Sequence, residues 1–109
     1  MADDEGLYVV ALDSSIDGSG FVETISAKNG TKKRLVQLTS KVDGNGSVRT
    51  YQDNVRELVR LGATDSGGFI SVYNKMGEDI ATMYADEYGN GVVGAWNRKG
   101  KGRTLKPGP

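Results

Sequence analysis

The 109-residue chain contains no cysteine and no histidine. Without cysteine, disulfide scaffolds, thiolate metal sites and cysteine nucleophiles are excluded. Without histidine, the commonest general base and the commonest metal ligand are both missing. The composition therefore predicts a protein that is not an enzyme and that uses no cofactor and no metal.

Large apolar side chains are also scarce, since the chain has one tryptophan and two phenylalanines against sixteen glycines. A domain of this length buries only about two-thirds of its unfolded surface, so we expect a thin core. A subunit interface can supplement such a core, and we therefore expect a homo-oligomer. No run approaches the ~20 apolar residues of a membrane span. The acidic residues after Met1 and the lack of a long apolar segment predict no signal peptide in this chain.

Charge is unevenly distributed, although the formal net charge is zero. Residues 1–27 contain acids and no lysine or arginine, whereas residues 88–109 contain bases and no acid. This asymmetry predicts head-to-tail attraction between copies. Dedicated nucleic-acid binders are usually basic overall, so we expect no nucleic-acid partner. A solvated basic tail and a tail that contacts an acidic protein both remain open. The residues predicted to direct assembly are Asp3, Asp4, Glu5, Arg98, Lys99, Lys101 and Arg103.

The chain carries a degenerate tandem repeat. Turns rich in aspartate and glycine alternate with turns that each contain asparagine, and equivalent turns lie roughly 21 to 26 residues apart, as in repeat folds. The first kind occupies 17–20, 43–46, 65–68 and 86–91, and the second occupies 28–30, 52–54, 74–77 and 97–100. Each unit also has two adjacent apolar or small residues: Val9 and Val10, Leu35 and Val36, Leu58 and Val59, and Ile80 and Ala81.

Short apolar segments bounded by glycine, asparagine and aspartate are typical of β-strands. We predict an all-β fold of eight or nine strands, built from about four two-strand repeats of roughly 23 residues. The strands would form a prism, a solenoid or a meander, with tight turns making neighbours antiparallel. The alternative is a helix over 51–61, where Val55, Leu58 and Val59 have helical spacing.

Three segments follow from this pattern. We predict a flexible acidic N-terminus at 1–6, a β-repeat domain at 7–99 and a basic tail rich in glycine and proline at 100–109. The tail would contain one short strand at 103–106. Recurring glycines are expected to define the turns, because positive φ or a close strand approach favours glycine. These turn-defining glycines are Gly20, Gly46, Gly68, Gly91, Gly77 and Gly100.

Residues 63–100 carry the clearest form of the repeat. An apolar strand from Ile70 leads into the turn from Asn74 to Gly77, and a second strand leads from Ile80 to Asp86 and then to Gly89, Asn90 and Gly91. This stretch resembles a family of poorly characterised bacterial tandem β-repeat proteins. The resemblance implies β-repeat architecture and an extracellular or cell-envelope setting. It carries over no catalytic residue.

Candidate chemical sites are weak. The segment 13–18 has oxygens at EF-hand positions 1, 3 and 5, but position 12 is Thr24 and not the bidentate glutamate. Carboxylate pairs at 78–79 and 86–87 lie at turns, where carboxylates are usually solvated, and the glycine clusters form no phosphate-binding motif. Aromatic residues could line a carbohydrate platform or pack across strands. They are Tyr51, Tyr73, Tyr84, Tyr88 and Trp96.

The sequence thus predicts a structural, self-assembling protein that forms a subunit or shaft segment of a fibre, filament or envelope assembly. Its partner would be itself, as a trimer or a head-to-tail filament. The alternative is a non-catalytic β-module that binds carbohydrate or protein.

Overall fold

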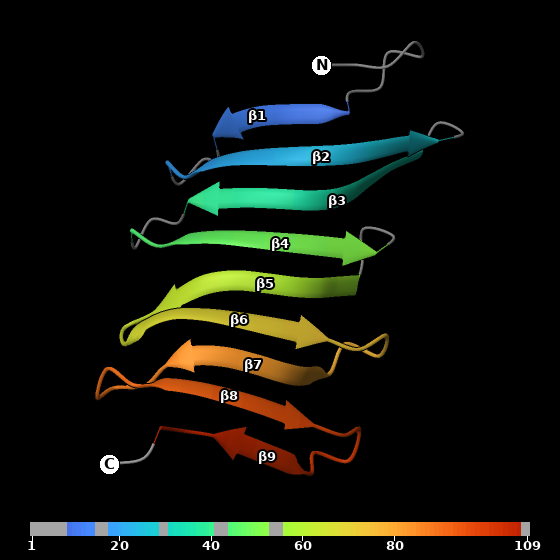
Figure 1. The fold of residues 1–109 in the computed structure, drawn as a ribbon. Coiled ribbons are helices and arrows are strands. Elements are labelled where there is room, and N and C mark those ends of the chain that lie inside the picture. The colour runs from blue at the N-terminus through green and yellow to red at the C-terminus, as the bar shows by residue number, and fades with distance from the viewer. Residues whose placement is uncertain (1–8, 15–17, 29–30, 41–43, 53–55, 108–109) are drawn as a thin grey trace.

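The computed structural model describes residues 9–14, 18–28, 31–40, 44–52 and 56–107, and these form nine strands and no helix (Figure 1). Each strand pairs antiparallel with the next, so the sheet order is the chain order. This confirms the all-β prediction and selects the meander. The strands are β1 Val10–Ser14, β2 Gly20–Lys28, β3 Thr31–Ser40, β4 Gly46–Gln52, β5 Arg56–Thr64, β6 Gly67–Tyr73, β7 Asp79–Ala85, β8 Gly91–Trp96 and β9 Gly102–Leu105.

The structure decides two local expectations, one against the sequence prediction and one in its favour. The helix considered for 51–61 is wrong, because its described residues belong to β4 and β5. The segment 51–61 has helical spacing of apolar residues, but its strand β5 forms backbone hydrogen bonds with β4 on one side and β6 on the other. The basic segment contains the expected short strand, which is β9 and pairs with β8. The acidic segment 1–6 lies outside the described residues.

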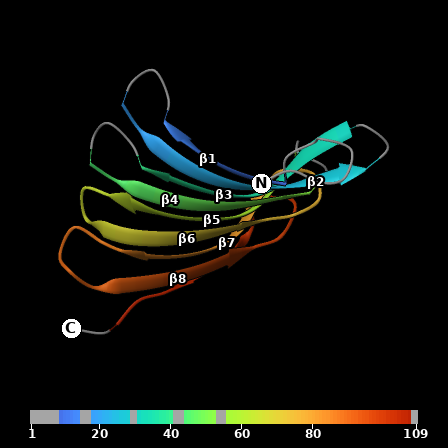
Figure 2. The ribbon, with the colours of Figure 1, turned by 90° about the horizontal axis from the view of Figure 1, so that it is seen from above.

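The described strands form a single curved and twisted layer, and no other described element covers either face (Figure 2). Its extents are 58 × 32 × 17 Å and its radius of gyration is 17.0 Å, against about 13 Å for a compact chain of this length. Among the described residues, Val92 is the only apolar side chain classed as buried. The thin core expected from composition is therefore almost absent from the isolated chain.

The register aligns one large apolar residue from every strand. Residues directly opposite each other in neighbouring antiparallel strands share a face, so these nine form a continuous line across the sheet, which we name the apolar row. Seven of the nine are exposed. The apolar row is Leu12, Val22, Leu38, Val48, Leu61, Ile70, Met83, Val93 and Leu105.

Two further rows share this face, because side chains two residues apart along a strand point the same way. On one side lies a row of glycine, serine and alanine, which we name the small row. On the other side lies the branched row, which is mostly valine, threonine and alanine. The small row is Ser14, Gly20, Ser40, Gly46, Ala63, Gly68, Ala85 and Gly91. The branched row is Val10, Thr24, Val36, Thr50, Val59, Val72, Ala81, Ala95 and Arg103. These three rows make up the apolar face.

The adjacent apolar residues of the repeat lie at β-bulges. The register shifts between β2 and β3, between β4 and β5, and between β6 and β7, each time by one extra residue on the odd-numbered strand. The extra residues are Leu35, Leu58 and Ile80. A bulge adds a residue and increases twist, so each strand accommodates two neighbouring apolar side chains and still keeps its alternation further along.

Three turns share one hydrogen-bonding pattern, although the sequence had placed them in two classes. The Oδ1 atoms of Asn74, Asp86 and Asn97 each accept from the backbone N–H groups two and four residues later, at 2.8 to 3.1 Å. The glycine three residues after each has positive φ, with +82° at Gly77, +85° at Gly89 and +81° at Gly100. Asx side chains thus replace backbone partners in these turns.

The backbone requirement expected at four glycines is not observed. Positive φ falls at the residues just before them, at Gly18, Gly44, Gly67 and Gly89. The chain reverses near these residues, and the four predicted glycines already belong to strands. No atom lies closer than 3.7 Å to a Cβ placed at any of the four. The prediction of positive φ or close strand approach is therefore wrong for Gly20, Gly46, Gly68 and Gly91.

Candidate functional site

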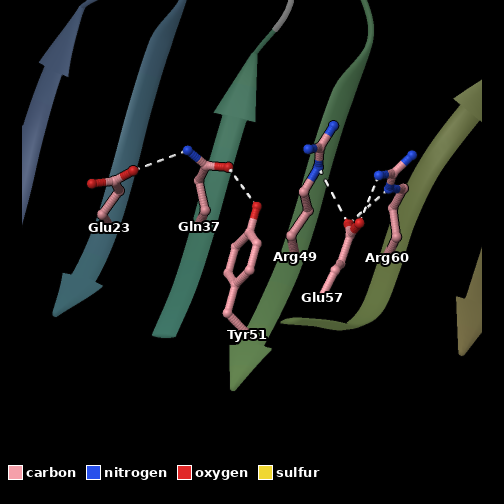
Figure 3. Close-up of polar contacts among 6 residues, drawn as sticks. All are labelled: Glu23, Gln37, Arg49, Tyr51, Glu57 and Arg60. Atoms are coloured by element: carbon pink, nitrogen blue, oxygen red, sulfur yellow. Dashed lines mark hydrogen bonds and ion pairs between the residues drawn. The ribbon is translucent and has the colours of Figure 1, made fainter. Parts of the chain in front are cut away.

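The face opposite the apolar face, which we name the polar face, carries a hydrogen-bonded network (Figure 3). Glu23, Gln37, Arg49 and Arg60 stand directly opposite one another on β2, β3, β4 and β5. Gln37 Nε2 donates to Glu23 Oε1 at 2.9 Å, and the Tyr51 hydroxyl donates to Gln37 Oε1 at 3.4 Å. Strand register therefore builds this network from residues that are far apart in the chain.

Arg34 joins the same part of the polar face. Its Nε atom lies 3.5 Å from Glu23 Oε1. Its guanidinium carbon lies 5.1 Å from the centroid of the Tyr51 ring, which is within the range of a cation–π contact. The carboxylate of Glu23 thus has both an amide and a guanidinium partner, and Tyr51 is held by its ring as well as by its hydroxyl.

Glu57 forms the second half of the network, between two arginines. Arg60 Nε donates to Glu57 Oε1 at 2.7 Å, and Arg60 Nη2 donates to Oε2 at 2.6 Å. This bidentate hydrogen bonding raises the pKa of Arg60, with burial opposing it and the charge of Glu57 adding to it. Arg49 Nε is buried and lies 3.6 Å from Glu57 Oε1, with no hydrogen bond in the described structure.

The bulge explains why Glu57 and Arg60 can meet. Residues three apart in a regular strand point to opposite faces. The extra residue Leu58 reverses that parity, so both side chains lie on the polar face. The same shift at Leu35 places Arg34 and Gln37 together. The sequence prediction missed this network because strict alternation separates these residues, and the adjacent apolar pairs were the only available signal of the bulges.

Aromatic residues recur on the polar face at equivalent positions. Tyr51, Tyr73 and Trp96 lie on β4, β6 and β8, opposite Glu57, Asp79 and Gly102 respectively. Strands two apart are separated by about 9–10 Å, so these rings form a widely spaced line. Trp96 also packs over Gly94 on its own strand. Tyr84 is on the same face, and Tyr88 lies in the β7–β8 turn, with 79% of its surface exposed.

The polar face is also packed by phenylalanine against glycine. Phe69 lies directly opposite Gly62, and a Cβ at Gly62 would be 2.8 Å from its ring. The absence of a side chain at Gly62 therefore lets the Phe69 ring lie flat across the neighbouring strand.

The carboxylates considered for catalysis have turn contacts. Asp86 Oδ1 accepts two backbone N–H groups of its own turn. Glu78 Oε1 accepts from Asn74 Nδ2 at 3.2 Å. Within the described ranges, no three acidic, histidine or cysteine side chains form a group that could hold a metal ion. That part of the chain also contains no helix long and apolar enough to cross a membrane.

The apolar face is hollowed along its small row. Two adjoining grooves share Leu61 and together extend from β1 to β8. Their walls include Leu12, Leu38 and Met83. Four glycines of the small row line them: Gly20, Gly46, Gly68 and Gly91. These glycines therefore shape an open apolar groove, which is a different role from the turn geometry expected of them.

The predicted assembly charges gather at one edge where they are described. Arg98 and Lys99 lie in the turn before β9, Lys101 directly precedes the strand, and Arg103 belongs to it. All four are exposed. Asp3, Asp4 and Glu5 lie outside the described residues.

No protein-family model matches the chain, and a search of curated proteins found no significant similarity. The resemblance to bacterial tandem β-repeat proteins therefore stays a prediction from the sequence.

Proposed function

We propose that this protein is a structural, self-assembling β-sheet module that serves as a subunit of a fibre, filament or envelope assembly. One observation carries the proposal: the apolar row runs across all nine strands, and seven of its residues are exposed. Monomeric soluble proteins rarely expose contiguous apolar patches larger than a few hundred Å². An extracellular or envelope setting belongs to the same proposal and is supported by the sequence resemblance.

The exposed surface area supports the same function. The chain exposes 7700 Å², whereas a compact chain of this size exposes about 5,800 Å². Folding of the isolated sheet buries correspondingly little apolar surface, and burial of apolar surface is the main favourable term in folding. Association with further copies supplies the missing burial.

Sedimentation equilibrium over a wide concentration range tests the proposal. We expect a mass that is a multiple of the chain mass, and electron microscopy then distinguishes discrete oligomers from filaments. A folded monomer at the highest concentration would overturn the structural function.

The polar face favours a second function, a non-catalytic module that binds carbohydrate or protein. Its aromatic line and its carboxylate, amide and guanidinium groups are the kinds of group that contact sugar hydroxyls and rings. A glycan array with the purified chain tests this function. Binding that is lost in Tyr73→Ala would favour it, and a blank array would count against the carbohydrate form.

A further inference from the structure

We infer that the apolar row and the small row of the apolar face are covered by a second copy of this chain, related by a two-fold axis parallel to the apolar row, so that the apolar row of each copy lies in the small row of the other. This inference rests on the proposed self-assembly and specifies its partner and surface. A two-fold contact uses the same patch on both copies, so the face must complement itself.

The rows provide that complementarity. Neighbouring rows lie about 6.6–6.8 Å apart along the strands, and one consists of large side chains while the next consists of glycine, serine and alanine. The large side chains form a ridge, and the small row forms the floor of the grooves. An axis midway between the two rows places each ridge in the other copy's groove. Face-to-face sheets interdigitate in this way at a separation of about 10 Å.

Charge identifies which face can be covered. Of the residues in the three rows of the apolar face, only Arg103 is charged, and it lies on the edge strand β9. The polar face instead carries Glu23, Arg49, Glu57 and Arg60 on β2, β4 and β5. These charges are paired, yet removing ion pairs from water still carries a desolvation penalty, whereas the apolar face can be removed from water without that cost. Asp13 also lines the groove, at the β1 end, so the few charges of this surface lie on its edge strands. The rows between them give a charged partner nothing to pair with and meet their own copy without repulsion.

The area is sufficient for a stable dimer. The chain exposes 7700 Å², which is about 1,900 Å² more than a compact chain of this size. A standard protein interface buries about 800 Å² on each partner. The surplus of the whole chain is therefore larger than the surface that one partner contributes to such an interface.

The proposed symmetry predicts a particular contact at the middle of the sheet. Because the axis is parallel to the rows, β5 of one copy lies over β5 of the other. Leu61, in the apolar row of β5, then lies opposite Ala63, in the small row of β5, of the second copy. An axis parallel to the strands would instead place Leu61 over Leu61.

A matched pair of lysine substitutions tests the face. Met83 is in the apolar row and is 52% exposed, whereas Met76 is in the β6–β7 turn and is 46% exposed. We expect Met83→Lys to weaken dimerisation about 100-fold or more, because the proposed contact buries its ammonium group. Met76→Lys adds the same charge and should leave dimerisation unchanged. Sedimentation equilibrium measures both, and circular dichroism checks that each variant keeps its strand content.

Thiol cross-linking tests the axis and does not depend on the folding of Met83→Lys. The chain has no cysteine, so Leu61→Cys and Ala63→Cys each introduce a single reporter. A short bifunctional thiol reagent should cross-link a mixture of the two variants several-fold more than either variant alone. Stronger cross-linking of Leu61→Cys with itself would overturn the proposed axis.

The outcomes separate this inference from the function on which it rests. If the parent chain is a monomer, both fail. If it self-associates and Met83→Lys associates as tightly as Met76→Lys, self-assembly stands and the apolar face is not its interface. Dissociation by Met83→Lys alone, together with cross-linking of the mixed variants, supports the inference.

Discussion

The two faces of this sheet are built from the same nine strands but differ in how their side chains are partnered. The polar face forms contacts within one chain, because guanidinium, carboxylate, amide and hydroxyl groups meet across four neighbouring strands. The apolar face has no such internal partner, because aliphatic side chains in a single layer can touch only their neighbours in the row. The comparison teaches that polar side chains can find partners within one layer, whereas a row of aliphatic side chains stays exposed until a second layer covers it.

Replacing one glycine by valine on each face should give the largest difference between the two faces in unfolding free energy. On the polar face, Gly62→Val brings a side chain against the Phe69 ring, which must move. We expect a loss of about 2–3 kcal/mol in unfolding free energy, as for overpacking. On the apolar face, Gly46→Val has no neighbour closer than 3.8 Å and should cost less than about 0.5 kcal/mol, as surface substitutions do.

Both glycine variants should be measured by urea unfolding in the Met83→Lys background, so that self-association does not contribute. Equal losses would show that the two faces are packed alike. In the parent background we expect Gly46→Val to weaken self-association, because it fills the proposed groove.

Glu57→Gln should destabilise the polar face without affecting assembly. The substitution removes the charge that holds Arg49 and Arg60, and it leaves two partly buried cations close together. We expect a loss of about 1–2 kcal/mol, between the values for exposed and buried ion pairs. Urea unfolding measures the loss, and sedimentation should show an unchanged oligomer.

Glu87→Gln provides the control for this substitution, because it removes the same charge from an exposed turn residue. We expect it to stay within about 0.5 kcal/mol of the parent. A comparable loss in Glu87→Gln would mean that net charge, and not the Glu57 contacts, determines the effect.

The turns belong to neither face and should respond independently of assembly. Asn74→Ala removes one Oδ1 atom that accepts two backbone N–H groups, at 2.9 and 3.0 Å. We expect a loss of about 1 kcal/mol in unfolding free energy. Asp86→Asn keeps an equivalent oxygen acceptor and should change stability little. If thermal unfolding shows both variants alike, the shared turn pattern does not contribute as we infer.

The smallest effect is expected at the basic edge. Replacing Arg98, Lys99, Lys101 and Arg103 together with glutamine tests the head-to-tail attraction predicted from the sequence. Exposed ion pairs contribute at most ~1 kcal/mol each, so the change should slow assembly and reduce its salt dependence, without dissociating dimers closed by the apolar face. Light scattering at low and high salt measures both effects. Assembly indistinguishable from that of the parent at low salt would eliminate the charge-directed step.

Much of the fold was predictable, and most of the candidate surfaces were not. Short apolar segments between Asx and glycine turns were enough to predict strands, and the short strand at the C-terminal end was expected within one residue of its position. The pairing of Glu57 with Arg60 was not predictable from alternation, because the bulge at Leu58 reverses the parity between them. The apolar row was hidden for a related reason, since it becomes visible only when register aligns one residue from each strand.

By itself, the sequence determined that the chain forms β-strands, where they turn, and that little apolar material is available for a core. Those properties are local, since they follow from turn residues, β-branched segments and composition. The tertiary structure decided which residues share a face, that the glycines of the small row line a groove, and that charged side chains of β2 to β5 form ion pairs on one side. These depend on register, because a shift of one residue moves every side chain of a strand to the opposite face.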